Sequence, residues 1–111
     1  MREVRRDGDG ELCGFVDRHD DRWYACVVFG SVLGVHDTER AAVDQVLADG
    51  LAALTGLWTL RDVDGREEHV RIVEAAPDRV TVARGYYVLA DVPRLSITGP
   101  ELRAGTWSLH R

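Results

Sequence analysis

Two histidines and three aspartates stand in two short segments that a β-sheet could bring together. His19, Asp20 and Asp21 follow one apolar run, and His36 and Asp37 follow another. In an up-down-up sheet, the first hairpin turn and the end of the third strand lie at the same edge. Because imidazole and carboxylate groups bind metal ions, His19, Asp21, His36 and Asp37 are candidate metal ligands. A solvated turn followed by a helix cap explains the same residues, and we favour it, so no metal or other cofactor is expected.

The two cysteines have no setting typical of catalysis. Cys13 and Cys26 lie in expected strands rather than at a helix N-terminus, where a thiolate would be stabilised. They are too few for a disulfide scaffold and form no CxxC pair, which indicates two buried free thiols. No Gly-x-Ser-x-Gly or phosphate-loop motif is present. These residues carry no argument for an enzyme.

Composition and charge exclude several classes of function. Hydrophobic residues make up 45% and charged residues 30% of the 111 residues, which is typical of a folded domain. The net charge is -5 and is uneven: through Gly56 there are 6 arginines against 11 acids, and afterwards 8 against 8. This charge weighs against a generic nucleic-acid or anionic-membrane binder. The chain has no apolar run of about 20 residues and no signal-peptide pattern at its start, so we expect a soluble cytoplasmic protein without membrane contact.

The first half predicts three strands and a helix. Residues 1–10 are polar and predict a frayed segment. Apolar runs at 11–18 and 22–29 flank a turn, and a short strand is expected over 32–36. A helix is predicted from Thr38 to Thr55, with an N-cap and an apolar face. We expect the side chains of that face to be buried: Val46, Leu47, Leu51 and Leu54.

The expected hairpin carries apolar residues on both faces. A two-residue turn at His19-Asp20 would place Phe15 opposite Tyr24, and Cys13 opposite Cys26. Trp23 and Tyr24 are adjacent, so they point to opposite faces and are candidate partner-binding residues. A sheet that is apolar on both sides must be covered twice. The helix can cover only one side.

The second half has the period of β-strands. Apolar residues recur two apart in five places: Trp58 and Leu60, Val70 and Ile72, Val80 and Val82, Leu95 and Ile97, Trp107 and Leu109. Thr98 and Glu101 have capping-box spacing, which predicts one helical turn before the last strand. The alternate positions are rich in arginine and hydroxyl groups. Their arginines, Arg71, Arg79 and Arg94, are candidates for contact with phosphate or an acidic protein.

These patterns predict an α+β fold of two modules. Residues 1–56 form a βββα module, and residues 57–111 form a small antiparallel β-module that is barrel-like or packed on the first sheet. If the second module closes as a barrel, the first sheet must meet a partner, most simply a second copy of the chain. If the apolar stripe of the second module instead faces the first sheet, the two modules share one core and the chain is a compact monomer. Of these two outcomes we favour the barrel and the homodimer.

Residues 11–56 resemble known modules of three strands and a helix. The runs that carry the resemblance are Asp21-Arg22-Trp23-Tyr24-Ala25-Cys26-Val27 and Leu33-Gly34-Val35-His36-Asp37-Thr38-Glu39-Arg40-Ala41-Ala42. They are similar to the arm-binding domains of tyrosine recombinases and to plant ethylene-response DNA-binding domains, and the element order is also similar to HicB-type antitoxins. The first two resemblances imply a sheet that enters the major groove, and the third implies protein binding. The second half resembles a small Src-homology-like barrel by strand count.

The sequence thus favours a non-enzymatic binding or regulatory protein that acts through a protein–protein surface. The alternative is a DNA-binding accessory or regulatory factor, of the recombinase or repressor type, that uses the arginine-bearing β-face. Only Arg18 and Arg22 lie in the stretch that resembles DNA-binding domains, among many acids. Phosphate attraction supplies much of the affinity for DNA, which is why we rank protein binding first.

Overall fold

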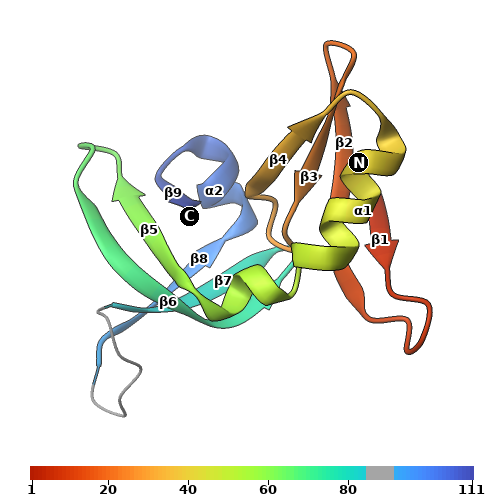
Figure 1. Ribbon diagram of the computed structural model, residues 1–111. Helices are drawn as coiled ribbons and strands as arrows, with labels where there is room; N and C mark the ends of the chain where they lie inside the picture. Colours follow the sequence, from red (N-terminus) through yellow and green to blue (C-terminus); the bar gives the residue numbers. More distant parts are fainter. Residues whose placement is uncertain (85–91) are drawn as a thin grey trace. The chain divides into compact units, whose positions relative to one another are not determined.

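The described part of the protein contains two antiparallel sheets and two α-helices, so the α+β class is confirmed. The computed structural model describes residues 1–84 and 92–111. The chain divides into two compact units, Met1–Ala53 and Leu54–Arg111, a boundary three residues before the one expected from the sequence. Figure 1 shows a helix and a sheet in the first unit and the long curved strand β6 in the second.

The first unit is a four-stranded sheet covered on one face by helix α1. Its strands follow one another in chain order: β1 (Arg2–Arg5), β2 (Leu12–His19), β3 (Arg22–Cys26) and β4 (Val32–His36). Helix α1 (Glu39–Asp49) contacts all four strands. Between helix and sheet lies a core of small apolar side chains, namely Val4, Cys13, Val16, Ala25, Ala42 and Val46.

The segment expected to be frayed contains a strand. Strand β1 pairs with β2, and Val4 is only 4% exposed within the core. Arg6 and Asp9 form an ion pair of 2.7 Å in the turn that follows, and the Arg6 guanidinium holds the pKa of Asp9 at about 2. Arg6 and Asp9 thus belong to the hairpin turn, whereas other polar residues, Arg2, Glu3 and Arg5, lie exposed in the strand that Val4 anchors.

The turn of the β2–β3 hairpin lies one residue later than expected. Asp20 and Asp21 occupy it, with φ of 50° and 63°. Two central residues of positive φ are typical of a type I′ turn, which matches the twist of the flanking strands. His19 therefore pairs with Arg22, and Phe15 lies opposite Cys26 rather than Tyr24. The predicted pairing of Cys13 with Cys26 is wrong.

Cys13 also lies on a different face from the one expected. In the β1–β2 ladder Val4 pairs with Gly14 and Arg5 with Leu12, so Cys13 is the extra residue of a β-bulge. The bulge turns its side chain into the core beneath α1. Gly14 has φ of 154° and lies so close to the Cys26 carbonyl that a Cβ would clash with it. The thiols are both buried and free, as expected.

Helix α1 is shorter than predicted. Thr38 caps its N-terminus by accepting a hydrogen bond from the Ala41 N–H at 3.1 Å. The helix ends at Asp49, and a 3-10 helix follows at Ala52–Thr55. Of the four residues expected to be buried, only Val46 is fully so.

The side chains of Leu47, Leu51 and Leu54 are not fully buried because α1 is short and contacts the sheet along one narrow row of residues. Leu47 is 45% exposed, which contradicts the prediction, and Leu51 and Leu54 are half-buried. Ala42, Val46 and Gly50 are spaced four apart and form the face that meets the sheet. Gly50 approaches the Cys13 carbonyl more closely than a Cβ would allow.

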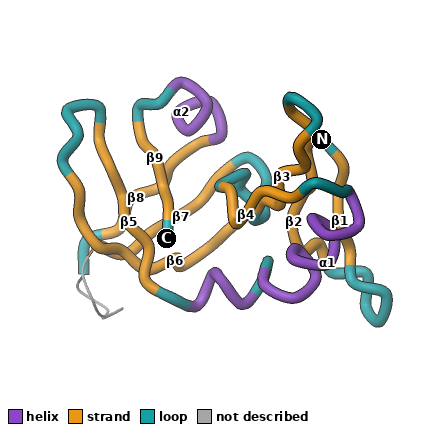
Figure 2. The backbone as a smooth tube through the Cα atoms, turned by 45° about the horizontal axis from the view of Figure 1, so that its top comes forward, coloured by secondary structure: helices purple, strands orange, loops and turns teal. Residues whose placement is uncertain are grey.

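The second unit is a five-stranded sheet whose last strand returns beside its first. The strands are β5 (Leu57–Asp62), β6 (Glu67–Ala76), β7 (Arg79–Arg84), β8 (Arg94–Thr98) and β9 (Trp107–His110), in the order β8-β7-β6-β5-β9. All five expected strands are present. Helix α2 (Gly99–Ala104) connects β8 to β9, as Figure 2 shows, and carries the predicted capping box. Within the described residues β8 and β9 remain edge strands, so the closed barrel that we favoured from the sequence is wrong.

The register of this sheet places its apolar residues on one face. The residues of this face are each at most 5% exposed: Trp58, Leu60, Val70, Val80, Val82, Ile97 and Leu109.

In the part of the chain that the structure describes, neither helix has the length and hydropathy needed to cross a bilayer.

Candidate functional site

The residues at the hairpin end of the first sheet do not form a metal centre. His19 contacts the Tyr24 ring edge-on at 5.9 Å, and its Nε2 lies 3.4 Å from Asp17. Asp37 lies 3.6 Å from Arg22. Among the described residues, no three His, Cys, Asp or Glu side chains are grouped so that they could hold a metal ion.

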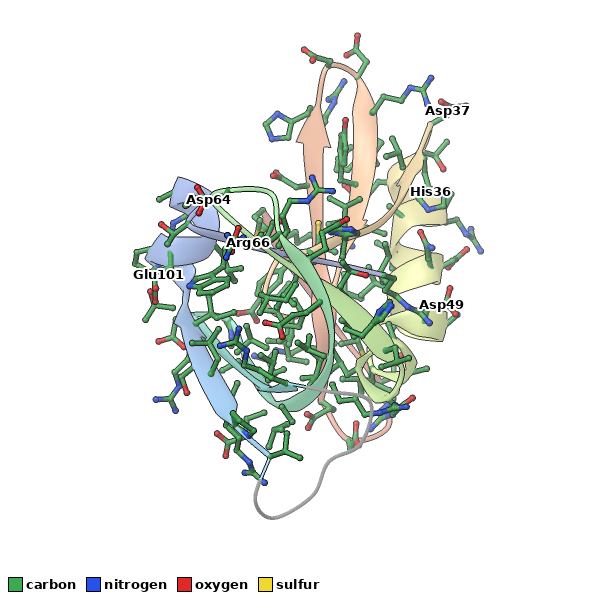
Figure 3. The ribbon with its side chains drawn as sticks, turned by 90° about the vertical axis from the view of Figure 1, so that its left-hand side faces the viewer. His36, Asp37, Asp49, Asp64, Arg66 and Glu101 are labelled. Carbon is green, nitrogen blue, oxygen red and sulfur yellow. The ribbon has the colours of Figure 1, made fainter. Side chains whose placement is uncertain are left out.

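His36 instead joins the strand to the helix. Its Nε2 lies 2.6 Å from Oε1 of Gln45 on α1, and Figure 3 shows His36 and Asp37 where β4 approaches the helix. Gly34 leaves room for this glutamine, because a Cβ there would crowd the same Oε1 atom. This histidine therefore has a structural partner.

The thiol of Cys26 is held in its protonated form. Burial, together with the charge of Asp17, raises its pKa to about 11. Its Sγ lies 4.0 Å from the Tyr24 carbonyl. A nucleophilic thiol needs a lowered pKa, so this environment favours a packing role.

A small hollow in the second unit has charged groups that are already engaged. It measures about 240 Å³ and is lined by Leu60, Asp62, Arg66, Glu67, Glu68, Arg84 and Trp107. Arg84 lies 2.6 Å from Glu68, and Asp62 accepts the backbone N–H groups of Asp64 and Arg66 at 2.9 and 3.0 Å. These two carboxylates serve an ion pair and a turn.

The face of the first sheet opposite α1 carries an apolar surface that we call the tyrosine face. It consists of Phe15, Tyr24, Cys26, Val32 and Val35, which the strand registers place on one side of β2, β3 and β4. Tyr24 lies directly between Asp17 and Val35. Val32 is 52% exposed and Val35 is 44% exposed, whereas Phe15 and Tyr24 are half-buried. The alternation of the sequence indicates Tyr24 but not the two valines, because β4 has a bulge at Leu33 that puts residues three apart on one face.

Trp23 lies on the other face, as its position next to Tyr24 predicted. It packs against the core beneath α1 and is half-buried. The Arg18 guanidinium lies 5.6 Å from the centre of its ring, within the range of a cation–π contact. Its neighbours are thus residues of its own unit.

The outward side of the second sheet carries the three arginines selected from the sequence. The register aligns Arg71, Ala83 and Arg94 in one row across β6, β7 and β8, and Arg79 pairs with Thr98 two positions along the same face. We call this side the arginine face. Its hydroxyl groups include Thr81 and Ser96, whose oxygens lie 2.9 Å apart.

The arginines of this face differ in their partners. Arg61 pairs with Glu67 at 2.9 Å, and Arg71 donates to the Thr55 carbonyl at 3.4 Å. Arg79 and Arg94 are exposed and have no ion pair among the described residues. Arg79 lines a hollow of about 410 Å³ together with Glu74, Ala75, Ala76 and Thr81. Two cationic groups are therefore available to an anionic partner.

Comparisons with known protein families, with curated proteins and with solved structures find no match to this chain.

Proposed function

We propose that this chain is a non-enzymatic binding or regulatory protein that acts through a protein–protein surface, and that the tyrosine face is this surface. The observation that supports the proposal is the exposure of Val32 and Val35 beside the half-buried Phe15 and Tyr24. Contiguous exposed apolar side chains on a soluble protein mark interaction sites more often than isolated ones do. Tyrosine is enriched in the energetically dominant parts of interfaces.

The charges around this face resemble the polar rim of an interface. Asp17, Arg22 and Asp37 border the apolar residues at the hairpin end of the face, and the Asp37 side chain is 86% exposed. A polar rim around an apolar centre is the usual anatomy of a protein interface. The partner is another protein or a second copy of this chain.

The test compares two exposed valines. Val35→Asp places a charge in the centre of the tyrosine face, and Val63→Asp makes the same exchange in the β5–β6 turn, where the valine is 71% exposed. Light scattering on the purified chain measures self-association. Affinity enrichment with quantitative mass spectrometry measures association with other proteins, and circular dichroism checks that both variants are folded.

We expect the wild type and the Val63→Asp variant to associate, with their own copy or with one other protein, and the Val35→Asp variant to lose this association. A 12.4 kDa particle at every concentration excludes the homodimer. If no association of either kind depends on Val35, the tyrosine face is not the binding surface.

A further inference from the structure

Among residues 1–84 and 92–111, strand β8 is an edge strand that pairs with a neighbouring strand through only half of its backbone groups. The N–H of Arg84 donates to the Pro93 carbonyl at 2.9 Å, and the N–H of Gly99 donates to the Asp78 carbonyl at 2.6 Å. In an antiparallel ladder, hydrogen-bonded pairs alternate with pairs that share no hydrogen bond. The backbone groups of Leu95 and Ile97 therefore face β7, and those of Arg94, Ser96 and Thr98 face away from it.

One neighbouring contact agrees with this alternation. The N–H of Thr98 donates to the Glu101 carboxylate at 3.1 Å as part of the capping box, so it is not engaged with β7. Within the described residues no further strand lies beside Arg94 and Ser96. An edge of this kind is a template for one more strand.

The two sides of this edge have different chemistry. On the arginine face, Arg94 and Ser96 are exposed at the edge itself, Arg79 lies one strand further in, and the face's exposed acid, Glu74, lies two strands further in. On the opposite side, Leu95 is half-buried and Ile97 is fully buried in the apolar core. An added strand would alternate its side chains between a cationic side and an apolar side.

We propose that the β8 edge binds an extended segment of a partner polypeptide in which acidic and apolar residues alternate. Backbone hydrogen bonds to Arg94 and Ser96 hold the segment as a sixth strand, a mode of recognition known as β-augmentation. Acidic side chains on the outward side pair with the Arg94 guanidinium. Arg79 is about 10 Å from the added backbone, two strand spacings away, a distance that its own side chain and a glutamate can span together.

The observations favour a polypeptide over duplex nucleic acid as the occupant. Binding to DNA draws most of its strength from many phosphate contacts, whereas this face offers two arginines that have no acidic partner in the described part of the chain. The chain as a whole carries a net charge of -5, which repels a long polyanion. The N–H and C=O groups at the edge of a strand pair with the C=O and N–H groups of another peptide backbone. A phosphate backbone offers acceptors but no N–H donors, so it cannot form this ladder.

The experiment measures the binding of labelled peptides by fluorescence anisotropy. The probe is an eight-residue peptide of alternating glutamate and valine. Its controls are a block peptide of the same composition and an alternating peptide of lysine and valine. A 20-base-pair DNA duplex is the competing class of partner. Hydrogen exchange of the Arg94 and Ser96 amides, measured by NMR, reports whether the peptide pairs with the edge.

We expect the alternating acidic peptide to bind about tenfold or more tightly than either control peptide, since a charge-assisted contact and strand pairing both depend on its pattern. Arg94→Glu should reverse the preference toward the lysine peptide. Arg66→Glu, an exposed arginine in the β5–β6 turn, is the control that should change nothing. The peptide should also slow the exchange of the Arg94 and Ser96 amides.

Three results would overturn the proposal: equal binding of the three peptides, no binding of any, or DNA binding that is tighter than peptide binding and lost with Arg94→Glu. This inference stands on a surface of the second unit and is independent of the tyrosine face. The Val35→Asp variant should therefore bind the acidic peptide as the wild type does, so that failure of one proposal leaves the other intact.

Discussion

Two adjacent residues of α1 should differ greatly in their contribution to the stability of the first unit. Val46 is fully buried among Val16, Ala25 and Ala42, whereas its neighbour Leu47 is 45% exposed. The same residue, asparagine, can be introduced at both positions. Asparagine has a moderate helix propensity, about equal to that of valine and about 0.5 kcal/mol below that of leucine.

The expected cost at the buried position is the sum of two effects. Val46→Asn loses about 2 kcal/mol of apolar burial. It also buries an amide for which the apolar core offers no hydrogen-bond partner, at about 1–3 kcal/mol. The total is about 4 kcal/mol. At the exposed position, Leu47→Asn loses about half of a leucine's burial and some helix propensity, together about 1.5 kcal/mol.

Native-state hydrogen exchange can measure both variants within the same molecule. Exchange of the β2 and β3 amides reports on the first unit, and the amides of β6 and β7 in the second unit are the internal control. Because about 1.4 kcal/mol corresponds to a factor of ten, we expect exchange roughly 10³-fold faster in Val46→Asn and roughly tenfold faster in Leu47→Asn. If Val46→Asn does not fold, Val46→Ala is the milder substitute. Its exchange should be accelerated more than that of Leu47→Asn and less than the factor expected for Val46→Asn. Equal acceleration by the two asparagine variants would show that α1 does not pack on the sheet through Ala42 and Val46.

Two further predictions concern a helix cap and a thiol. Thr98→Ala removes the capping box of α2, in which Thr98 and Glu101 exchange hydrogen bonds, and should destabilise the second unit by about 1 kcal/mol; a urea titration with no change in midpoint would contradict it. Cys26 has a pKa of about 11 in the folded protein against an ordinary value of 9.0, so the unfolded chain releases this proton first as the pH rises. The free energy of unfolding that this thiol contributes is therefore complete below pH 9 and is lost as the pH rises toward 11. Urea titrations followed by circular dichroism measure this loss. The Cys26→Ala variant should lose less stability over this pH range than the wild type does.

The sequence by itself determined the elements whose signals are local. The five alternating apolar pairs of the second half each became a strand, because side chains two apart share a face whatever the partner strand is. The capping box at Thr98 and the N-cap at Thr38 are equally local, since each joins residues three apart. The selection of Arg71, Arg79 and Arg94 as one face followed from the same alternation.

Only the tertiary structure decided the registers, the bulges and the edges. The hairpin turn lies one residue later than predicted, so Phe15 pairs with Cys26 instead of Tyr24. A bulge in β2 places Cys13 on the opposite face from the one predicted. Neither could be read from the sequence, because register depends on pairing across the sheet. Val4 converts a polar segment into a strand through contacts with residues far along the chain. Leu47 fits the helical pattern as well as Val46 does, yet the sheet has room for only one of them. The unpaired edge of β8 is a property of strand order, which arises when β9 returns to pair with β5.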